Sequence, residues 1–129
     1  MKYIERLYIF NYGGPIAVLE IEDTKIKITT QFADRNMIEG MAFVASLIQK
    51  YKDLKFFNMK NYVGYLGKTY IAIAYINKTR FAASVLGELR RIVLRLDLIG
   101  DAPVDYLVKL VVHSLYASSG GNKYHIVYQ

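Results

Sequence analysis

The sequence predicts an α+β fold built on one mainly antiparallel sheet of five or six strands. The central evidence lies in residues 55–98, where apolar residues first recur about every second position and then about every 3.6 positions. The first spacing is typical of strands and the second of an amphipathic helix. Short turn sequences between the apolar runs, such as Leu66-Gly67-Lys68, favour hairpins, and a hairpin makes its two strands antiparallel.

The composition indicates a single domain that folds without disulfide bonds. Of the 129 residues, 53% are hydrophobic and 22% are charged, which is enough apolar material for a core. Cysteine is absent, which excludes disulfides, cysteine nucleophiles and cysteinyl metal sites. The first residues lack the pattern of a signal peptide, and no apolar run reaches the roughly 18 residues of a membrane span. We therefore expect a cytoplasmic domain over residues 1–129, with 119–129 as a C-terminal extension or added strand.

The net charge of +6 is unevenly placed. Its positive excess falls on residues 50–68 and 78–95, so one part of the surface is expected to be basic. A basic face favours an acidic partner, which can be a protein, a nucleotide phosphate, a nucleic acid or a lipid head group. An equally good interpretation is a solvated surface that keeps the protein in solution.

Three strands are predicted before the first helix. Residues 4–10 and 16–21 are strand-like and flank a Gly-Gly turn, so they form a hairpin in which Pro15 begins the return strand at a sheet edge. Residues 25–30 alternate polar and apolar side chains, which indicates a half-exposed strand. The lysines of this strand are typical of an edge protected against aggregation.

The first helix is predicted over residues 35–50, with Asp34 as its N-cap. Its apolar stripe is wider than one sheet face requires, because Phe43 and Leu47 lie beside the repeating apolar positions. The extra residues either fill the core or form one side of a groove for a partner.

Three further strands and two helices follow. Residues 55–59, 61–66 and 69–76 are predicted strands, and the last is apolar enough to be a central strand covered on both faces. Asn77 or Thr79 is the expected cap of a helix that ends near Leu98, and Pro103 opens the next helix. Residues 124–128 are expected to form a final short strand or an ordered tail.

The second of the three predicted helices has a core face and a basic face. Its core face is predicted to contain Ala82, Val85, Leu86, Leu89, Val93 and Leu96. Arg80, Arg91 and Arg95 fall on the opposite stripe. The spacing also permits ion pairs from Arg91 and Arg95 to Glu88, so a solvated face competes with a binding face.

No catalytic, cofactor-binding or metal-ligating residues are predicted. The two histidines, His113 and His125, lie on different elements and have no companion at ligand spacing. Ser46, Ser84 and Ser114 all fall in predicted helices, outside any nucleophile elbow. The acidic residues at 20–23 cluster at a turn, where solvation is the expected state.

Nucleic-acid binding is the alternative hypothesis, because basic residues interleave with aromatic residues in the middle of the chain. Bases stack on such rings while lysines contact phosphates. Tyrosine is also a good strand former, so a tyrosine-rich sheet gives a similar pattern. The residues concerned are Tyr51, Lys52, Lys55, Phe56, Phe57, Lys60, Tyr62, Tyr65, Lys68 and Tyr70.

The order of elements resembles the longin fold, a relative of the roadblock and profilin-like folds, once the strand at 25–30 is set aside. The segment Leu7-Tyr8-Ile9-Phe10-Asn11 before a glycine hairpin resembles the opening of longin domains. A helix followed by Phe57-Asn58-Met59-Lys60-Asn61-Tyr62 and a hairpin resembles their middle. The strand at 25–30 and the tail after Ser118 depart from the longin pattern. We expect an archaeal-type member of the longin or the roadblock domains.

This resemblance implies one helix on one face of the sheet, two helices on the other, and an edge strand at residues 55–59. Longin and roadblock domains use such edges and helices to form dimers or to dock small Ras-like GTPases and trafficking partners, without a catalytic centre. We therefore expect a non-enzymatic, self-associating interaction module whose partner is a small GTPase. A small-ligand sensor is a third hypothesis, which a preformed cavity would favour. The candidate partner-binding residues are Phe43, Leu47, Lys55, Phe56, Phe57, Met59, Arg80, Arg91 and Arg95.

Overall fold

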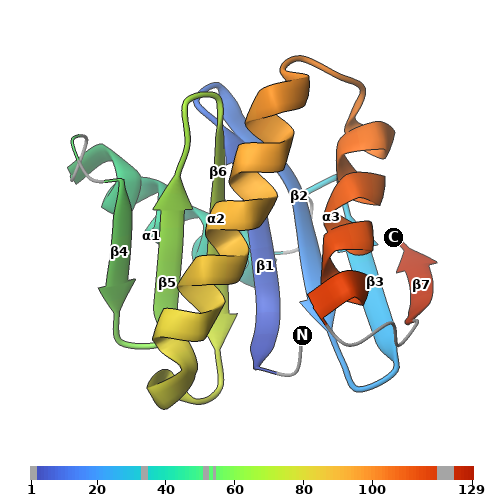
Figure 1. The fold of residues 1–129 in the computed structure, drawn as a ribbon, viewed down its shortest axis with the longest axis horizontal. Helices are drawn as coiled ribbons and strands as arrows, with labels where there is room; N and C mark the ends of the chain where they lie inside the picture. Colours follow the sequence, from blue (N-terminus) through green and yellow to red (C-terminus); the bar gives the residue numbers. More distant parts are fainter. Residues whose placement is uncertain (1–2, 33–34, 51–52, 54, 119–123) are drawn as a thin grey trace.

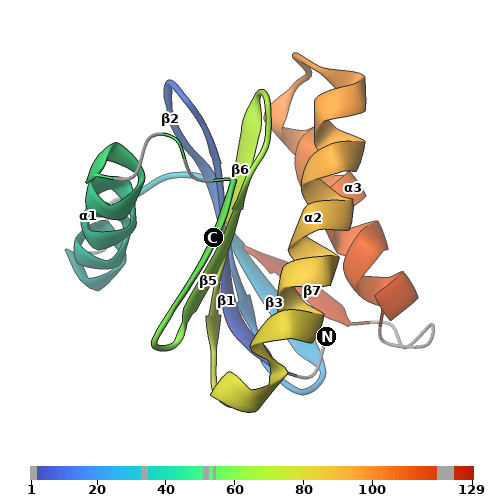
Figure 2. The same cartoon turned by 60° about the vertical axis from the view of Figure 1, so that its left-hand side comes forward.

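The computed structural model of the chain describes residues 3–32, 35–50, 53, 55–118 and 124–129. Seven strands form one sheet in the order β4-β5-β6-β1-β2-β3-β7, and only the β3–β7 pair is parallel among those described. Helix α1 lies on one face of the sheet, and α2 and α3 lie on the other (Figures 1 and 2). The elements are β1 (Ile4–Asn11), β2 (Gly14–Ile21), β3 (Lys25–Thr29), α1 (Arg35–Lys50), β4 (Phe56–Met59), β5 (Tyr62–Leu66), β6 (Tyr70–Ile76), the 3-10 turn η1 (Thr79–Phe81), α2 (Ala82–Ile99), α3 (Val104–Ser118) and β7 (His125–Tyr128).

The α+β class is confirmed, whereas the sheet has seven strands rather than five or six. The additional strand is β7, which pairs in parallel with β3 from Lys25–His125 to Ile28–Tyr128. Strand β3 is therefore not an edge, and the prediction that its lysines protect an edge is wrong. Lys25 and Lys27 are half-buried. The sequence of β3 does not show that the end of the chain returns to it.

The prediction that Pro15 begins an edge strand is also wrong, because β2 lies between β1 and β3. Two features let the sheet accept Pro15, which has no backbone N–H group. Strand β3 pairs only with residues 18–21 of β2, and the β1–β2 register shifts between Ile9 and Phe10, beside Pro15. The turn is closed by Asn11, whose Oδ1 accepts hydrogen bonds from the N–H groups of Gly13 (2.8 Å) and Gly14 (3.0 Å).

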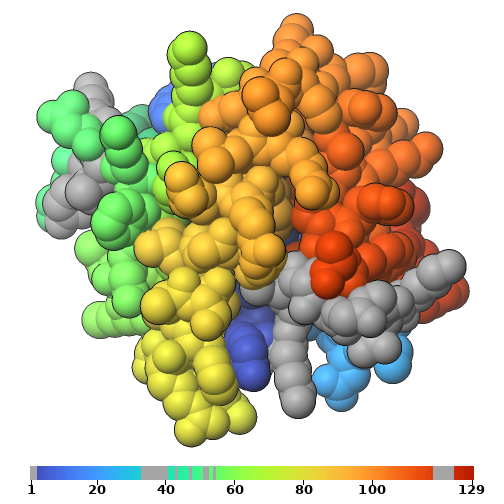
Figure 3. Space-filling model, viewed as in Figure 1, coloured from blue at the N-terminus to red at the C-terminus, as the bar shows by residue number. Residues whose placement is uncertain are grey.

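The larger of two apolar cores lies between the sheet and α2 and α3. Every residue of β6 except Tyr75 is buried, which confirms β6 as a central strand covered on both faces. Figure 3 shows α2 and α3 covering much of one face, with green residues of β4 and β5 visible beside α2. The smaller core lies beneath α1, where Met41 and Val44 pack with Tyr8 and Ile73.

The predicted start of α2 is corrected by the structure. Neither Asn77 nor Thr79 caps α2, because the 3-10 turn η1 precedes Ala82 and neither helix has a side-chain cap hydrogen bond. The ring of Phe81 instead stacks on Tyr3, with 3.7 Å between ring centroids. Of the predicted core face of α2, all residues are buried except Leu86, which is half-buried. Asp34, the predicted cap of α1, lies outside the described residues.

Tyr70 joins β6 to the end of α2. Its hydroxyl donates a hydrogen bond to the carbonyl oxygen of Gly100 (2.6 Å), and burial raises the pKa of Tyr70, with smaller contributions from Asp101 and Asp97. A folded-state pKa above the unfolded value, which is about 10, means that the folded state favours the protonated phenol. The stabilisation by the protonated Tyr70 phenol is fully present below the pKa that Tyr70 has in the unfolded state. It is lost as the pH rises through the pKa that Tyr70 has in the folded state.

We therefore expect the free energy of unfolding to fall above a pH of about 10. The variant Tyr70→Phe should be less stable at neutral pH by about 1 kcal/mol because it lacks the hydrogen bond. The gap between the two proteins should narrow at alkaline pH, because phenylalanine does not ionise. Urea unfolding at a series of pH values measures this, with the exposed Tyr106→Phe as a control. A gap that stays constant across the series would contradict the expectation.

Candidate functional site

Strand β4 forms one border of the sheet. It pairs with β5 on one side, and no described strand pairs with its other side (Figure 1). Its side chains alternate between the two faces. Phe56 lies on the face that carries α2, and Phe57 lies on the face that carries α1. The main-chain groups on the outer side of β4 pair with no described strand, and such a border is where a further strand can add to a sheet.

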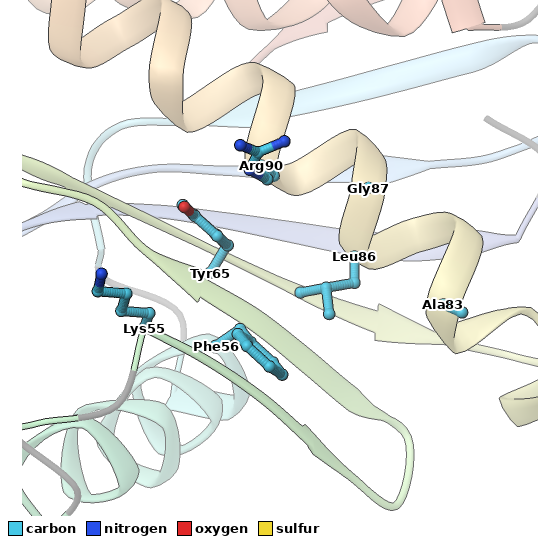
Figure 4. A pocket seen from close by; sticks show the side chains of 7 residues that line it. All are labelled: Lys55, Phe56, Tyr65, Ala83, Leu86, Gly87 and Arg90. Atoms are coloured by element: carbon cyan, nitrogen blue, oxygen red, sulfur yellow. The ribbon is translucent and has the colours of Figure 1, made fainter.

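A groove runs beside this border, between the β4–β5 pair and α2. Its volume is about 400 Å³, and Phe56, Tyr65 and Leu86 supply its apolar walls (Figure 4). Phe56 is 55% exposed, so its ring is accessible at the groove. The groove therefore offers apolar surface next to the side of β4 that pairs with no described strand.

Two cationic side chains flank the groove. Lys55 and the hydroxyl end of Tyr65 lie toward the same end of it, and Arg90 approaches from α2 (Figure 4). Within the described part of the chain, neither Lys55 nor Arg90 takes part in an ion pair. Among the described residues that line the groove, none is acidic. The site is thus apolar along its length and positively charged at its rim.

Arg90 is the functional candidate that sequence reasoning missed. The arginines predicted from the sequence lie on the stripe of α2 opposite its core face. The groove instead lies along the side of α2 that is between the core face and that stripe. Leu86 is the residue in the sequence that could have indicated Arg90. It lies one turn before Arg90 and lines the groove from a position predicted as core.

The structure does not bring the three predicted arginines into this groove. Arg91 forms an ion pair with Glu88, and Arg95 donates a hydrogen bond to the hydroxyl oxygen of Ser114 on α3 (3.2 Å). The guanidinium of Arg80 lies 4.9 Å from the ring centroid of Phe81. Of the sequence-predicted site residues whose side chains the structure describes, only Lys55 and Phe56 line the groove.

The other predicted residues of β4 point toward α1. Phe57 packs against the core beneath α1, and Met59 is half-buried. The side chains of Phe43 and Leu47 lie outside the described residues, so the predicted groove beside them is not part of this description. The border strand and the α2 groove therefore define the candidate site.

The aromatic residues of the nucleic-acid hypothesis are divided between the two faces. Tyr65 packs with the α2 side of the sheet and Tyr62 with the α1 side, and Tyr70 is buried. Bound bases need rings that share an accessible surface. Tyr51 and Lys52 lie outside the described residues. Of the described rings, Phe56 and Tyr65 share the α2 groove, whereas Phe57 and Tyr62 lie on the other face, so only part of the predicted aromatic set shares one surface.

His113 and Ser114 are neighbours on α3, but His113 is exposed whereas Ser114 is buried. His113 and His125 are exposed on α3 and β7, and the hydroxyl of Ser114 donates a hydrogen bond to the carbonyl oxygen of Leu110 (3.0 Å). Across the described ranges, no three His, Asp or Glu side chains are grouped closely enough to hold a metal ion.

Comparisons with protein-family models, with curated proteins and with solved structures found no match. The resemblance to longin and roadblock domains therefore depends on the order of the elements and the short segments described above. Among the helices of the described residues, none has the length and apolar character needed to cross a membrane.

Proposed function

We propose that the chain is a non-enzymatic protein-interaction module that accepts a strand from an acidic protein partner at β4. The observation that carries the proposal is the position of Phe56, an exposed aromatic side chain that lines the groove with Lys55 and Arg90, on a strand whose outer side pairs with no described strand. Strand addition supplies main-chain hydrogen bonds, and an adjacent apolar pocket supplies specificity for alternate side chains. Phe56 is suited to be the aromatic anchor.

The charge of the rim supports an acidic partner. Lys55 and Arg90 flank the groove, so an approaching carboxylate gains favourable electrostatic interactions from both. A small Ras-like GTPase is the partner class that the longin and roadblock resemblance favours, and a scaffold or regulator of such a protein is the corresponding role. Two copies of this chain pairing through β4 would bring like charges together, which disfavours a homodimer through this groove.

An extended peptide of alternating glutamate and valine tests the site without a known partner. We expect it to bind at low salt and to perturb the amide signals of residues 55–59 and 83–90. The variant Phe56→Ala should weaken binding about thirtyfold, because central aromatic anchors contribute about 2 kcal/mol to interfaces. Titration by NMR measures the shifts of the amide signals and the affinity for the peptide. Phe56 is exposed, so its removal should leave the fold intact.

Tyr128→Ala is the matched control, since Tyr128 is also an exposed aromatic residue on a border strand. It should bind the peptide as the parent protein does. Equal binding of a lysine–valine peptide, or undiminished binding by Phe56→Ala, would contradict the proposal. A light-scattering mass of a dimer that Phe56→Ala returns to a monomer would instead place a second copy at this border.

A further inference from the structure

The opposite border of the sheet carries a second groove, between α3 and β7. Its volume is about 500 Å³, which falls within the range of roughly 300–1,000 Å³ typical of small-ligand sites. Leu110 and Val112 of α3 and Ile126 of β7 supply aliphatic surface. This groove is separated from the β4 site by the width of the sheet (Figure 1), so it does not depend on the proposed function.

Aromatic side chains form much of the remaining wall. Tyr106 and Tyr128 are 50% and 61% exposed, and Tyr116 is half-buried. The Tyr116 ring stacks on Tyr124 with 5.9 Å between centroids, and its hydroxyl donates a hydrogen bond to the carbonyl oxygen of Tyr124 (3.2 Å). These contacts attach the chain just before β7 to α3. The groove is therefore formed before any ligand binds, which lowers the entropic cost of binding.

The polar groups at this groove carry positive charge or hydrogen-bond donors. Lys109 and His113 are one helical turn apart on α3, and both line the groove. None of the residues that line it is acidic. Among the residues that the structure describes, Lys109 takes part in no ion pair. The charge pattern therefore complements a ligand with a single anionic group at one side of an apolar body.

We propose that this groove binds an amphipathic carboxylate with a linear alkyl chain. The chain lies along the aliphatic surface of Leu110 and Ile126 between the tyrosine rings, and the carboxylate meets Lys109 and His113. The aliphatic and aromatic lining makes burial of methylene groups the main source of affinity. The cationic rim then determines that the head group is an anion rather than an alcohol or an ammonium group.

Octanoate, hexanoate and octyltrimethylammonium are the probes, and titration of the full chain by NMR is the measurement. We expect octanoate to shift the signals of residues 106–116 and 126–128. It should bind roughly fifteenfold more tightly than hexanoate, because it has two more methylene groups and each contributes about fourfold when buried. Octyltrimethylammonium carries the opposite charge on an alkyl chain that is one carbon longer than the heptyl chain of octanoate. It should nevertheless bind more weakly than octanoate, because its head group is repelled by Lys109.

The variant Lys109→Glu tests the contribution of the head group. It should weaken octanoate binding about fivefold and strengthen octyltrimethylammonium binding, since an attraction of an exposed charge is replaced by a repulsion of similar size. Lys78→Glu makes the same change in net charge at an exposed position on another part of the surface and should leave both affinities unchanged.

Several results would overturn the proposal. They are equal affinity for the two carboxylates, equal effects of the two lysine variants, shifts confined to residues outside α3 and β7, and no shift at millimolar octanoate. A light-scattering mass of a dimer, together with no response to octanoate, would assign the groove to a second copy and would also overturn it. None of these outcomes bears on the Phe56→Ala test at the other border.

Discussion

Replacing Asp97 with alanine is expected to lower the free energy of unfolding by about 3 kcal/mol. Asp97 lies on α2, and its carboxylate accepts hydrogen bonds from the backbone N–H groups of Lys68 (2.7 Å), Thr69 (3.0 Å) and Tyr70 (3.0 Å). Lys68 and Thr69 lie in the turn between β5 and β6, and Tyr70 is the first residue of β6. Without the carboxylate, these N–H groups lose a charged acceptor and the turn is no longer held against the helix.

Urea unfolding measures this effect, and two variants serve as comparisons. Asp97→Asn retains one acceptor oxygen, so its loss should be about half as large. Asp101→Ala removes an exposed carboxylate nearby and should change stability by less than about 0.5 kcal/mol. A loss for Asp97→Ala no greater than the loss for Asp101→Ala would show that the turn does not depend on this carboxylate.

Gly67 makes this contact between turn and helix possible. A Cβ atom at residue 67 would overlap the side chains of Val93 and Asp97 and would lie 2.8 Å from the carbonyl oxygen of Tyr70. Only glycine therefore lets the turn approach α2 closely. The carbonyl oxygen of Gly67 also accepts a hydrogen bond from the hydroxyl of Tyr12 (2.7 Å), which connects the β1–β2 turn to the same end of the sheet.

Local patterns in the sequence predict most elements of this fold. The range predicted for α1 agrees with Arg35–Lys50, and the six predicted strands before α2 are present with small changes at their ends. Periodicity is a property of neighbouring residues, so it identifies a strand or a helix without knowledge of its surroundings. Leu89 and Val93 were likewise recognised as core residues because they recur at helical spacing, and both are fully buried.

Contacts between distant residues were not predictable in the same way. Asp97 lies between two leucines on α2, and nothing near it in the sequence indicates a turn 27 to 29 residues earlier as its partner. The pairing of β7 with β3 has the same character, because it joins two segments about 100 residues apart. Both depend on how the completed sheet and helices meet.

The candidate site depends both on local sequence patterns and on contacts between distant residues. The expectation of a border strand at residues 55–59 came from the order of elements, and β4 lies at a border. Which arginine faces the groove depends on the rotation of α2 over the sheet, and that rotation is set by packing of the whole core. For this reason Arg90 lines the groove, whereas the choice from the sequence was Arg80, Arg91 and Arg95.

The variant Gly64→Val is expected to lower the free energy of unfolding by about 3 kcal/mol and to loosen β4. Gly64 of β5 is buried and lies between Phe57 of β4 and Ile73 of β6 in the sheet register. A Cβ atom there would overlap the Phe57 ring and would lie 3.1 Å from Cγ1 of Ile73. The ring of Phe57 packs over the space that the glycine leaves, so a larger residue displaces it.

Urea unfolding gives the loss of stability, and amide hydrogen exchange of residues 56–59 reports on β4. The double variant Gly64→Val, Phe57→Ala should be more stable than the sum of the two single changes indicates, because valine then occupies space that the ring has left. Gly87→Ala is the control, since no atom lies within 4 Å of its added Cβ and alanine is the better helix former. Additive losses would show that Phe57 and Gly64 act independently. Coupled losses with faster exchange in β4 would show that the glycine positions the border strand on which the docking proposal depends.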